Sequence, residues 1–474
     1  MAVYEPTIGL EIHAELKTRT KMFCDSANDP FTAEANTHIC PVCLAHPGTL
    51  PVINAEAVKH VLRVGLALKG ELADYTEFDR KNYFYPDLPK GYQLSQYEFP
   101  LVKGGELSGV QITRVHLEED TASSIHDEKT GATLVDYNRA GVPLMELVTE
   151  PVISSAEHAG RFARDLQLLL RYLGASEANM ERGEMRVEAN VSLGQNGVYG
   201  TKVEIKNLNS FRAMERAVAY ELDRQKKLIE SGGTVVQETR GWDESKQATF
   251  SQRIKEGSAD YRYFPDPDLP FLKLSELPEF HPDILRDALS ELPEDRRKRY
   301  RDLALQSDDI ELLVRDRRFG DYFDEVTKIA AVEYNTAINY VANDLVKIIR
   351  DIEERDTKSL DKIPISATHF AKLIEMIQMK TVSSRSAKDI LTALVSHDQD
   401  PEVYAKAEGL LQETNIEKLR EVALRILNRH GQVAEDYKAG KDSALEFLLG
   451  QSMKELKGAG DPEMLREILR SLIR

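Results

Sequence analysis

The sequence has little of several features that would place it in a familiar class. Only three of its 474 residues are cysteine, an odd number that cannot all pair internally. A disulfide-stapled scaffold is therefore not expected, and a reducing compartment is. No apolar run approaches the roughly 20 residues that a membrane helix needs, and residues 1–13 lack the basic and apolar segments of a secretory signal. These absences predict a cytoplasmic protein that does not act at a membrane.

Positive charge is also scarce. The chain has 62 Lys and Arg against 79 Asp and Glu, a net charge of −17, whereas a general nucleic-acid-binding protein is usually basic. The imbalance is uneven, because residues 401–474 carry 12 basic and 13 acidic side chains, which leaves −16 for the first 400 residues. We expect an RNA contact on the nearly neutral tail and a metal site on the acidic body.

Several sequence signatures of enzymes are missing. The Gly104-Gly105 and Gly232-Gly233 pairs lack the Gly-Lys-Ser/Thr context of a phosphate-binding loop, so we expect both to be turns. No Ser-His-Asp or Cys-His set for nucleophilic catalysis is apparent, and there are no internal repeats or low-complexity segments. A nucleotide would have to be held by metal ions and side chains.

The chain does show two patterns of predicted elements. Residues 7–16, 186–193 and 201–206 alternate apolar and polar side chains, which predicts strands of an antiparallel sheet covered on one face. Residues 156–173 and 211–230 have helical spacing after serine caps. The predicted fold class is α+β, with a largely antiparallel sheet domain followed by an all-helical domain and a small helical tail. Their expected limits are 1–290, 291–400 and 401–474, with a polar linker at residues 397–401.

Acidic side chains gather in the sheet region. Glu11 and His13 stand on one face of the first predicted strand, so their side chains can point at a common centre about 5 Å away. Residues 116–120 add three acids, and Glu146 and Glu150 lie in an apolar run, where charges are costly unless paired or metal-bound. Each acid alone would more often belong to a solvated face. Together, carboxylates with one imidazole favour Mg²⁺ or Mn²⁺ over zinc or copper.

Residues 136–146, DYNRAGVPLME, match D-x-N-R-x-G-x-P-L-x-E, a signature of the B subunit of the tRNA-dependent amidotransferases. The chain resembles this family over essentially its whole length. Further matching segments follow in one order at residues 8–13, 78–87, 206–210, 260–265 and 447–451.

The resemblance implies both a reaction and an assembly. Family members convert Glu-tRNA(Gln) to Gln-tRNA(Gln) and often Asp-tRNA(Asn) to Asn-tRNA(Asn). A cradle-like, kinase-like domain uses ATP and Mg²⁺ to phosphorylate the side-chain carboxylate of the misacylated tRNA, and ammonia then attacks. The expected partners are an amidase-type A subunit, a small C subunit and the tRNA, which the tail would bind. The sequence does not decide which of the two tRNA substrates is used.

The resemblance also carries over site residues. It makes Glu11, His13, Glu119 and Glu146 the expected Mg²⁺ ligands, with Glu118 and Glu150 as weaker candidates. Glu188 stands where relatives often have aspartate, so the acid is kept with one extra methylene, and Val152 replaces an acid found in many relatives. The expected catalytic set is Glu11, His13, Glu119, Glu146, Glu150 and Glu188, and the expected ATP-binding set is Arg139, Arg186, Lys202 and Lys206. Lys202 and Lys206 could instead pair with acids across strands.

Residues 78–92, FDRKNYFYPDLPKGY, allow three interpretations. The mixture of aromatic and basic side chains fits an RNA surface or a packed loop whose tyrosines fill the core. The resemblance adds a third, in which Lys81 and Lys90 belong to a polar channel that conducts ammonia from the A subunit. Buried charges along such a path would have to be paired.

The three cysteines, Cys24, Cys40 and Cys43, are spaced as C-x15-C-x2-C. Zinc-bearing relatives show Cys-x-Cys at the first position, where this chain has Ser26. Three thiolates need a fourth ligand, for which the sequence offers Asp25, His38 and His46. A degenerate, metal-free knuckle is the main expectation and Zn²⁺ binding the alternative.

A non-catalytic tRNA-binding scaffold is the competing interpretation of the whole chain. It would not require the set of acids and histidine, which therefore favours the enzyme. ATP hydrolysis that depends on misacylated tRNA would separate the two.

Overall fold

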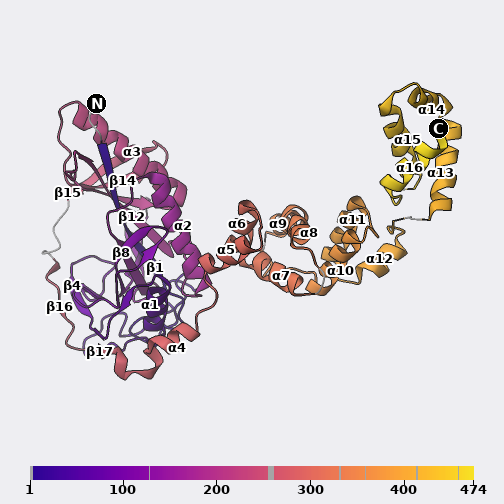
Figure 1. The fold of residues 1–474 in the computed structure, drawn as a ribbon. Coiled ribbons are helices and arrows are strands. Elements are labelled where there is room, and N and C mark those ends of the chain that lie inside the picture. Colours follow the sequence, from indigo (N-terminus) through magenta and orange to yellow (C-terminus); the bar gives the residue numbers. More distant parts are fainter. Residues whose placement is uncertain are drawn as a thin grey trace. The chain divides into compact units, whose positions relative to one another are not determined.

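The computed structural model describes residues 4–127, 129–254, 261–329, 332–357, 359–412, 415–456 and 458–473. Contacts divide the chain into two compact units, Met1–Pro293 and Glu294–Arg474 (Figure 1). Asp260 of a family-like segment, and Lys457 and Arg474 of the tail, lie outside the described residues.

The first unit is built on a sheet in which ten strands are described, in the order β15-β14-β13-β12-β1-β11-β8-β6-β2, with β7 paired to β8 off this path. Neighbouring strands run antiparallel except the parallel pair β13 and β14. The strands are β1 (Tyr4–Glu15), β2 (Glu71–Leu72), β6 (Val102–Lys103), β7 (Glu106–Leu107), β8 (Val110–Glu119), β11 (Pro143–Thr149), β12 (Met185–Gln195), β13 (Val203–Leu208), β14 (Glu238–Asp243) and β15 (Ala248–Ile254).

Short strands form three smaller sheets in the same unit. The pairs are β9 (Ser123–His126) with β10 (Thr133–Asp136) and β3 (Tyr75–Thr76) with β17 (Leu272–Lys273), and the third sheet joins β16 (Phe264–Pro265), β4 (Asp79–Asn82) and β5 (Tyr92–Ser95). Phe264 and Pro265 pair with Arg80 and Asp79 of β4, respectively.

Helices cover one face of the large sheet. Figure 1 shows α2 and α3 running alongside it. Ile8, Leu10 and Ile12 of β1 are fully or almost fully buried in a core that they share with helical residues, and the polar residues between them face the other way. The helices are α1 (Ala55–Ala67), α2 (Ala156–Tyr172), α3 (Phe211–Glu230) and α4 (Pro282–Asp287), with single 3₁₀ turns at Leu274–Glu276 and Pro278–Phe280.

Local sequence signals explain where the long helices begin and end. The Ser155 hydroxyl accepts a hydrogen bond from the His158 N–H at the start of α2, and the Ser210 hydroxyl accepts one from the Ala213 N–H at the start of α3. Helix α3 ends before Gly232, whose φ of +81° is the left-handed conformation that glycine adopts without strain. The predicted α+β fold class is confirmed.

The second unit is helical. Its first helices pack around Phe319, Phe323 and Phe370, which are fully buried, and its last four share a separate core that includes Leu419, Leu448 and Leu465. The helices are α5 (Pro293–Asp302), α6 (Ser307–Arg315), α7 (Arg317–Lys328), α8 (Tyr334–Tyr340), α9 (Val346–Asp356), α10 (Ala367–Gln378), α11 (Ser384–Ser396), α12 (Pro401–Ala407), α13 (Ile416–Arg429), α14 (Gly431–Lys438), α15 (Asp442–Glu455) and α16 (Pro462–Ile473), with a π-helical turn at Val341–Leu345.

The predicted linker at residues 397–401 proves to be a short, well-capped connection. Helix α11 ends at Ser396 and α12 begins at Pro401, where the Asp400 carboxylate accepts hydrogen bonds from the Glu402 and Val403 N–H groups. The three predicted domain limits stay a prediction. None of the described helices combines the length and the apolar character needed to cross a bilayer.

A carboxylate–arginine network joins α7 to the end of α9. Arg318 donates to Asp316 and to Glu353, and Glu353 also accepts from the Leu360 N–H at 2.8 Å. Burial raises the pKa of Glu353, but its hydrogen bonds with Arg318 and Leu360 outweigh burial, so the pKa lies below its usual value of 4.5. The ionised form is therefore the one that stabilises this contact.

This network predicts a pH-dependent stability. Because the folded pKa of Glu353 lies below the unfolded one, its contribution is present above about pH 4.5 and is lost as pH falls through the folded pKa. We expect Glu353→Gln to lower the free energy of unfolding by about 1–2 kcal/mol at neutral pH and by less in acid, measured by urea unfolding. Glu354→Gln, an exposed neighbour, is the control, and an equal loss at both pH values would contradict the assignment.

Candidate functional site

The polar face of the large sheet brings together side chains from distant parts of the sequence. His13 of β1 lies opposite Glu146 of β11, which in turn lies opposite His116 of β8. On the other side of β1, Glu11 lies opposite Glu188 of β12. Residues directly opposite each other in an antiparallel sheet point to the same face, so these strands build one polar surface.

A compact cluster of carboxylates and imidazoles stands at the centre of this surface. His13 Nε2 lies 3.4 Å from Glu146 Oε2, 3.5 Å from Glu118 Oε1 and 3.9 Å from Glu11 Oε1. His116 Nε2 also lies 3.4 Å from Glu146 Oε2. The cluster contains two sets of potential metal ligands, Glu11/His13/Glu146 and His116/Glu118/Glu146. Within each set, the ligand atoms lie within 4.8 Å of one another. Glu146 belongs to both sets and is the centre of the cluster.

Burial and proximity shift the ionisation of the cluster. Burial and the Glu146 carboxylate raise the pKa of Glu11. Burial raises the pKa of Glu146 too, but the imidazoles of His116 and His13 outweigh it and hold the pKa well below its usual range. Burial lowers the pKa of His13, yet its hydrogen bond with Glu146 and three nearby carboxylates raise the pKa to about 9. In the pair of His13 and Glu146, the proton thus sits on the His13 imidazole, and the Glu146 carboxylate is ionised.

Basic side chains surround the cluster and line the same cleft of about 580 Å³, a size typical of small-molecule sites. Arg186 donates to Asp120 at 2.8 Å, Lys206 donates to Glu188 at 2.8 Å, and Arg114 lies 3.6 Å from Glu146. Three buried polar atoms here, Glu188 Oε2, His116 Nδ1 and Arg114 Nε, have no hydrogen-bond partner among the described residues. Buried polar groups without partners are uncommon in folded proteins and mark where a ligand could bind.

A second cavity of about 210 Å³ is lined by Cys24, Cys43, Lys90 and Glu119, among other residues. Glu119 alternates along β8 with Glu118, which lines the cleft. Lys90 forms an ion pair with Glu119, whose Oε1 also accepts the Leu94 N–H at 3.0 Å. Both side chains are largely buried, so each charge depends on the other.

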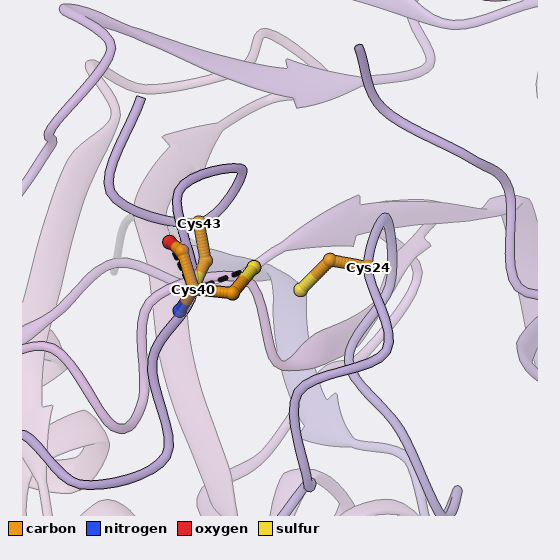
Figure 2. Close-up of side chains that lie close together, drawn as sticks. All are labelled: Cys24, Cys40 and Cys43. Carbon is orange, nitrogen blue, oxygen red and sulfur yellow. Dashed lines mark hydrogen bonds between the residues drawn. The ribbon is translucent and has the colours of Figure 1, made fainter. Parts of the chain in front are cut away.

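The three cysteines come together from two segments, with Cys24 facing the turn that holds Cys40 and Cys43 (Figure 2). Cys43 Sγ accepts the Cys40 N–H at 3.1 Å and lies 3.8 Å from Cys40 Sγ and 3.8 Å from the ammonium of Lys21, which is fully buried. Burial lowers the pKa of Lys21, and Cys43 counteracts that fall. A hydrogen bond from Cys24 lowers the pKa of the Cys43 thiol, burial raises it, and the Cys40 N–H and the Lys21 ammonium help to hold it below its ordinary range.

Comparison with known proteins decides the family. The family model of the GatB/GatE catalytic domain matches residues 6–277, and that of the GatB domain matches residues 321–473. The chain belongs to the GatB family. The B subunit of the aspartyl/glutamyl-tRNA(Asn/Gln) amidotransferase from Carboxydothermus hydrogenoformans is 42% identical, with 99% of each chain covered. The proteins of the same name from Thermoanaerobacter pseudethanolicus and Crocosphaera subtropica are 42% and 39% identical over 98% and 99% of this chain, and 98% of each relative is covered.

The GatB-like catalytic domain brings Glu11, His13, Glu146 and Glu188 to one cleft, together with Arg139, Arg186 and Lys206. Glu119 lies elsewhere, on the opposite face of β8, where it pairs with Lys90. Its neighbour Glu118, expected to be the weaker candidate, lies beside His13 instead. The physical reason is strand alternation, which sends adjacent residues to opposite faces.

Two further residues of the expected set lie outside the cleft of this GatB family member. The pairing of β11 shifts between Val148 and Thr149, and Glu150 beyond this irregularity accepts a hydrogen bond from the Thr113 hydroxyl at 2.7 Å. Lys202 is exposed, immediately ahead of β13. Lys206 forms an ion pair with Glu188 on the neighbouring strand. This is the cross-strand pairing that the sequence allowed for Lys206.

The tyrosine-rich segment, residues 78–92, contributes side chains to both cavities. Lys81 lies in the cleft of the cluster, 5.1 Å from the centre of the Tyr261 ring, whereas Lys90 lies in the cavity of the cysteines. Burial lowers the pKa of Lys81, but Glu118 and other neighbours outweigh it and raise the pKa. Phe84 and Tyr85 are exposed, so the segment is not simply a packed loop.

His116 and Arg114 are cleft residues to which sequence reasoning gave no role. The signal for His116 was its position two residues before Glu118, which puts both on one face of a strand. Recognising it required the pairing of β8 with β11, which no local pattern specifies. Among the described residues, no His, Asp or Glu ligand atom lies within 4.8 Å of all three cysteine sulfurs, so Asp25, His38 and His46 do not stand where a fourth zinc ligand would be needed.

Proposed function

We propose that this chain is the ATP-using B subunit of an aspartyl/glutamyl-tRNA(Asn/Gln) amidotransferase. It phosphorylates the side-chain carboxylate of a misacylated Glu-tRNA(Gln) or Asp-tRNA(Asn) in the cleft of the large sheet and so prepares it for attack by ammonia. The observation that carries the proposal is the buried cluster of Glu11, His13, Glu118 and Glu146 in a cleft rimmed by arginine and lysine.

The donor set of the cluster fits Mg²⁺. Glu11, Glu118 and Glu146 each place a carboxylate oxygen within 3.9 Å of His13 Nε2, and Glu146 belongs to both sets of potential ligands. Hard oxygen donors are the ligands that Mg²⁺ prefers. Glu11, His13, Glu118 and Glu146 would hold the ion, for which the His13 imidazole has to give up its proton. Glu118 replaces Glu119 in the set because of its position. A divalent ion bound there would neutralise charge on phosphoryl oxygens.

The side chains around the cluster suit phosphoryl transfer. Catalysis of this reaction is mostly positioning and electrostatic stabilisation. Arg186 and Arg139 are both held by Asp120, with Arg186 at 2.8 Å and Arg139 at 3.8 Å, so their guanidinium groups are fixed at the rim. Arg186, Arg139 and Lys206 bind the phosphates of ATP in the proposed complex. The phosphorylated carboxyl group then has a phosphate as its leaving group in place of oxide.

The proposed enzyme needs other chains. An amidase-type A subunit supplies ammonia, a small C subunit joins the pair, and the assembly works in the cytoplasm. Lys81 and Lys90 remain the proposed polar path for ammonia, with Lys90 in the cavity of the cysteines and Lys81 at the end of the path, inside the cleft itself. The wall between the cavities includes β8, whose residues Glu118 and Glu119 point into different ones.

ATP hydrolysis tests the proposed function. We expect the assembled enzyme to hydrolyse ATP only with Mg²⁺ and misacylated tRNA present, measured as released phosphate. Uncharged tRNA is the matched control. Tight tRNA binding without such hydrolysis would instead support the competing function, a non-catalytic tRNA-binding scaffold.

The tail is the proposed tRNA-binding element. Helices α13–α16 share their own core, and the tail is nearly neutral within an acidic protein. Arg466 pairs with Glu446 of α15, not with Glu463 or Glu467, and Arg470 is exposed. Each phosphate contact adds roughly one counterion to the salt dependence of binding.

Removal of the tail gives a testable result. Because α12 packs against α10 with Ala405 fully buried, we delete residues 415–474 and keep α12. We expect the KM for aminoacyl-tRNA to rise and its salt dependence to flatten, with ATP binding unchanged. If the truncated subunit in the assembled enzyme binds tRNA with the same affinity and salt slope, the tail is not the tRNA-binding element.

A further inference from the structure

The buried lysine next to the cysteines has an unusual counter-charge. Lys21 is fully buried, and its ammonium donates to the Tyr137 carbonyl at 3.1 Å and to Cys43 Sγ at 3.8 Å. Within the described residues, its ammonium forms no carboxylate ion pair within 4.0 Å. A buried ammonium is costly unless it is paired, and the cysteine sulfur is the group here that can become an anion.

Cys43 collects the donors that stabilise a thiolate. The Cys40 N–H points at its sulfur at 3.1 Å, the Ser26 hydroxyl lies at 3.8 Å, and Lys21 supplies positive charge. The sequence Cys40-Pro41-Val42-Cys43 is also a Cys-x-x-Cys turn, a setting in which thiolates form readily. Figure 2 shows Cys40 beside Cys43, with its N–H donating to the Cys43 sulfur and its own sulfur 3.8 Å away. The Cys40 carbonyl, at 3.4 Å, accepts from Cys43 only while Cys43 is a neutral thiol.

The cluster is better suited to thiol chemistry than to a structural metal. Structural zinc is nearly always held by four protein ligands, and the described ligand atoms within 4.8 Å here are three sulfurs. Lys21 already places a positive charge where a metal would place one.

We propose that Cys43 is a redox-reactive thiolate that a hydroperoxide oxidises and that Cys40 then captures in a disulfide. The two sulfurs lie 3.8 Å apart and must close to about 2.05 Å, which rotation of side chains within one short turn can provide. Cys43 lines the cavity of about 210 Å³, which is large enough for a small peroxide. This inference does not depend on the proposed amidotransferase activity.

The chemistry balances in two steps. The Cys43 thiolate attacks one peroxide oxygen, the O–O bond breaks, an S–O bond forms, and the alcohol or water leaves after taking up a proton. The Cys40 thiol then attacks the sulfur of the sulfenic acid, the S–S bond forms, the S–O bond breaks, and water leaves with the thiol proton. The two thiols together lose two electrons, which reduce the peroxide.

Mass spectrometry of the full chain tests the pairing. After treatment with hydrogen peroxide, we expect a peptide in which Cys40 and Cys43 are joined, and its loss on reduction. Cys40→Ser should leave a sulfenic acid at Cys43 that dimedone traps. Cys24→Ser, which keeps a hydrogen-bond donor at position 24, should still form the disulfide between Cys40 and Cys43. A disulfide to Cys24, or no oxidation at Cys43, would overturn the proposal.

The role of Lys21 has its own readout. Lys21→Met should move the midpoint of the pH profile for alkylation of Cys43 by iodoacetamide to higher pH. Below that midpoint, each unit of the shift lowers the thiolate fraction about tenfold. If this variant fails to fold, trapping at Cys43 in Cys40→Ser still decides the question. The proposal would be overturned if the purified chain contained one bound zinc ion that protected all three thiols from alkylation.

Discussion

Replacing Glu146 by glutamine is expected to abolish ATP-dependent amidation, with a loss of at least about a thousandfold in kcat. Glu146 is the residue that both carboxylate–imidazole sets share, at 3.4 Å from His13 and 3.4 Å from His116. Glutamine keeps the shape of the side chain and removes its charge, so the two imidazoles lose their common anion. Binding of Mg²⁺, followed by calorimetry in the presence of ATP, should weaken in parallel.

The control for this variant lies on the same sheet. Glu5→Gln changes an exposed carboxylate on β1, the strand that carries Glu11 and His13, and should leave amidation and Mg²⁺ binding unchanged. Both variants should keep the melting temperature of the assembled enzyme within a few degrees of the natural one. Full amidation by the Glu146 variant would refute the assignment of the cleft.

The second large effect is expected when Lys90 is replaced, and it concerns the delivery of ammonia. Lys90 lies outside the cleft and pairs with Glu119, so blocking it should impair delivery of ammonia more than the chemistry. We expect Lys90→Met combined with Glu119→Gln to reduce glutamine-driven amidation about tenfold or more, and amidation driven by added ammonium much less. The Glu119 change is included because a buried carboxylate left without its cation costs about 3–5 kcal/mol.

Lys81 gives the contrast. It lies in the cleft itself, close enough to Glu118 and Glu146 for both carboxylates to raise its pKa, so Lys81→Met should reduce amidation with both nitrogen donors. Comparing the two rates in each variant separates a path for ammonia from a role in the cleft. Equal losses with both donors in the Lys90 double variant would count against the path.

The sequence predicted best where the information is local. Glu11 and His13 stand two residues apart on an alternating strand, so their convergence needed no knowledge of the rest of the chain. The starts of α2 and α3 were predicted from single serine caps, and both caps make the expected hydrogen bonds. Strand alternation and helix capping act over a few residues and are therefore legible in sequence.

The sequence predicted less well which side chains face the cleft, because that depends on the pairing of strands that are distant in the sequence. Glu118 and Glu119 are adjacent acids, and only the register of β8 against β11 determines which one faces His13. The irregularity between Val148 and Thr149 likewise separates Glu150 from Glu146. A one-residue change of register reverses which side chains face a given cavity, and nothing within either strand fixes it.

The place of β1 in the sheet has a consequence for how the protein is made. Residues 4–15 leave the ribosome before β11 and β12 do, yet β1 lies between these two strands, whose residues run from Pro143 to Gln195. Until those strands are synthesised, β1 has neither of its final neighbours, and its apolar residues have no sheet to join. The backbone hydrogen-bonding groups of β1 therefore stay without their final partner strands while all the residues between Glu15 and Pro143 are synthesised. Non-local pairing of this kind folds slowly and exposes intermediates to aggregation, so chaperone binding during translation should concentrate on residues 4–15.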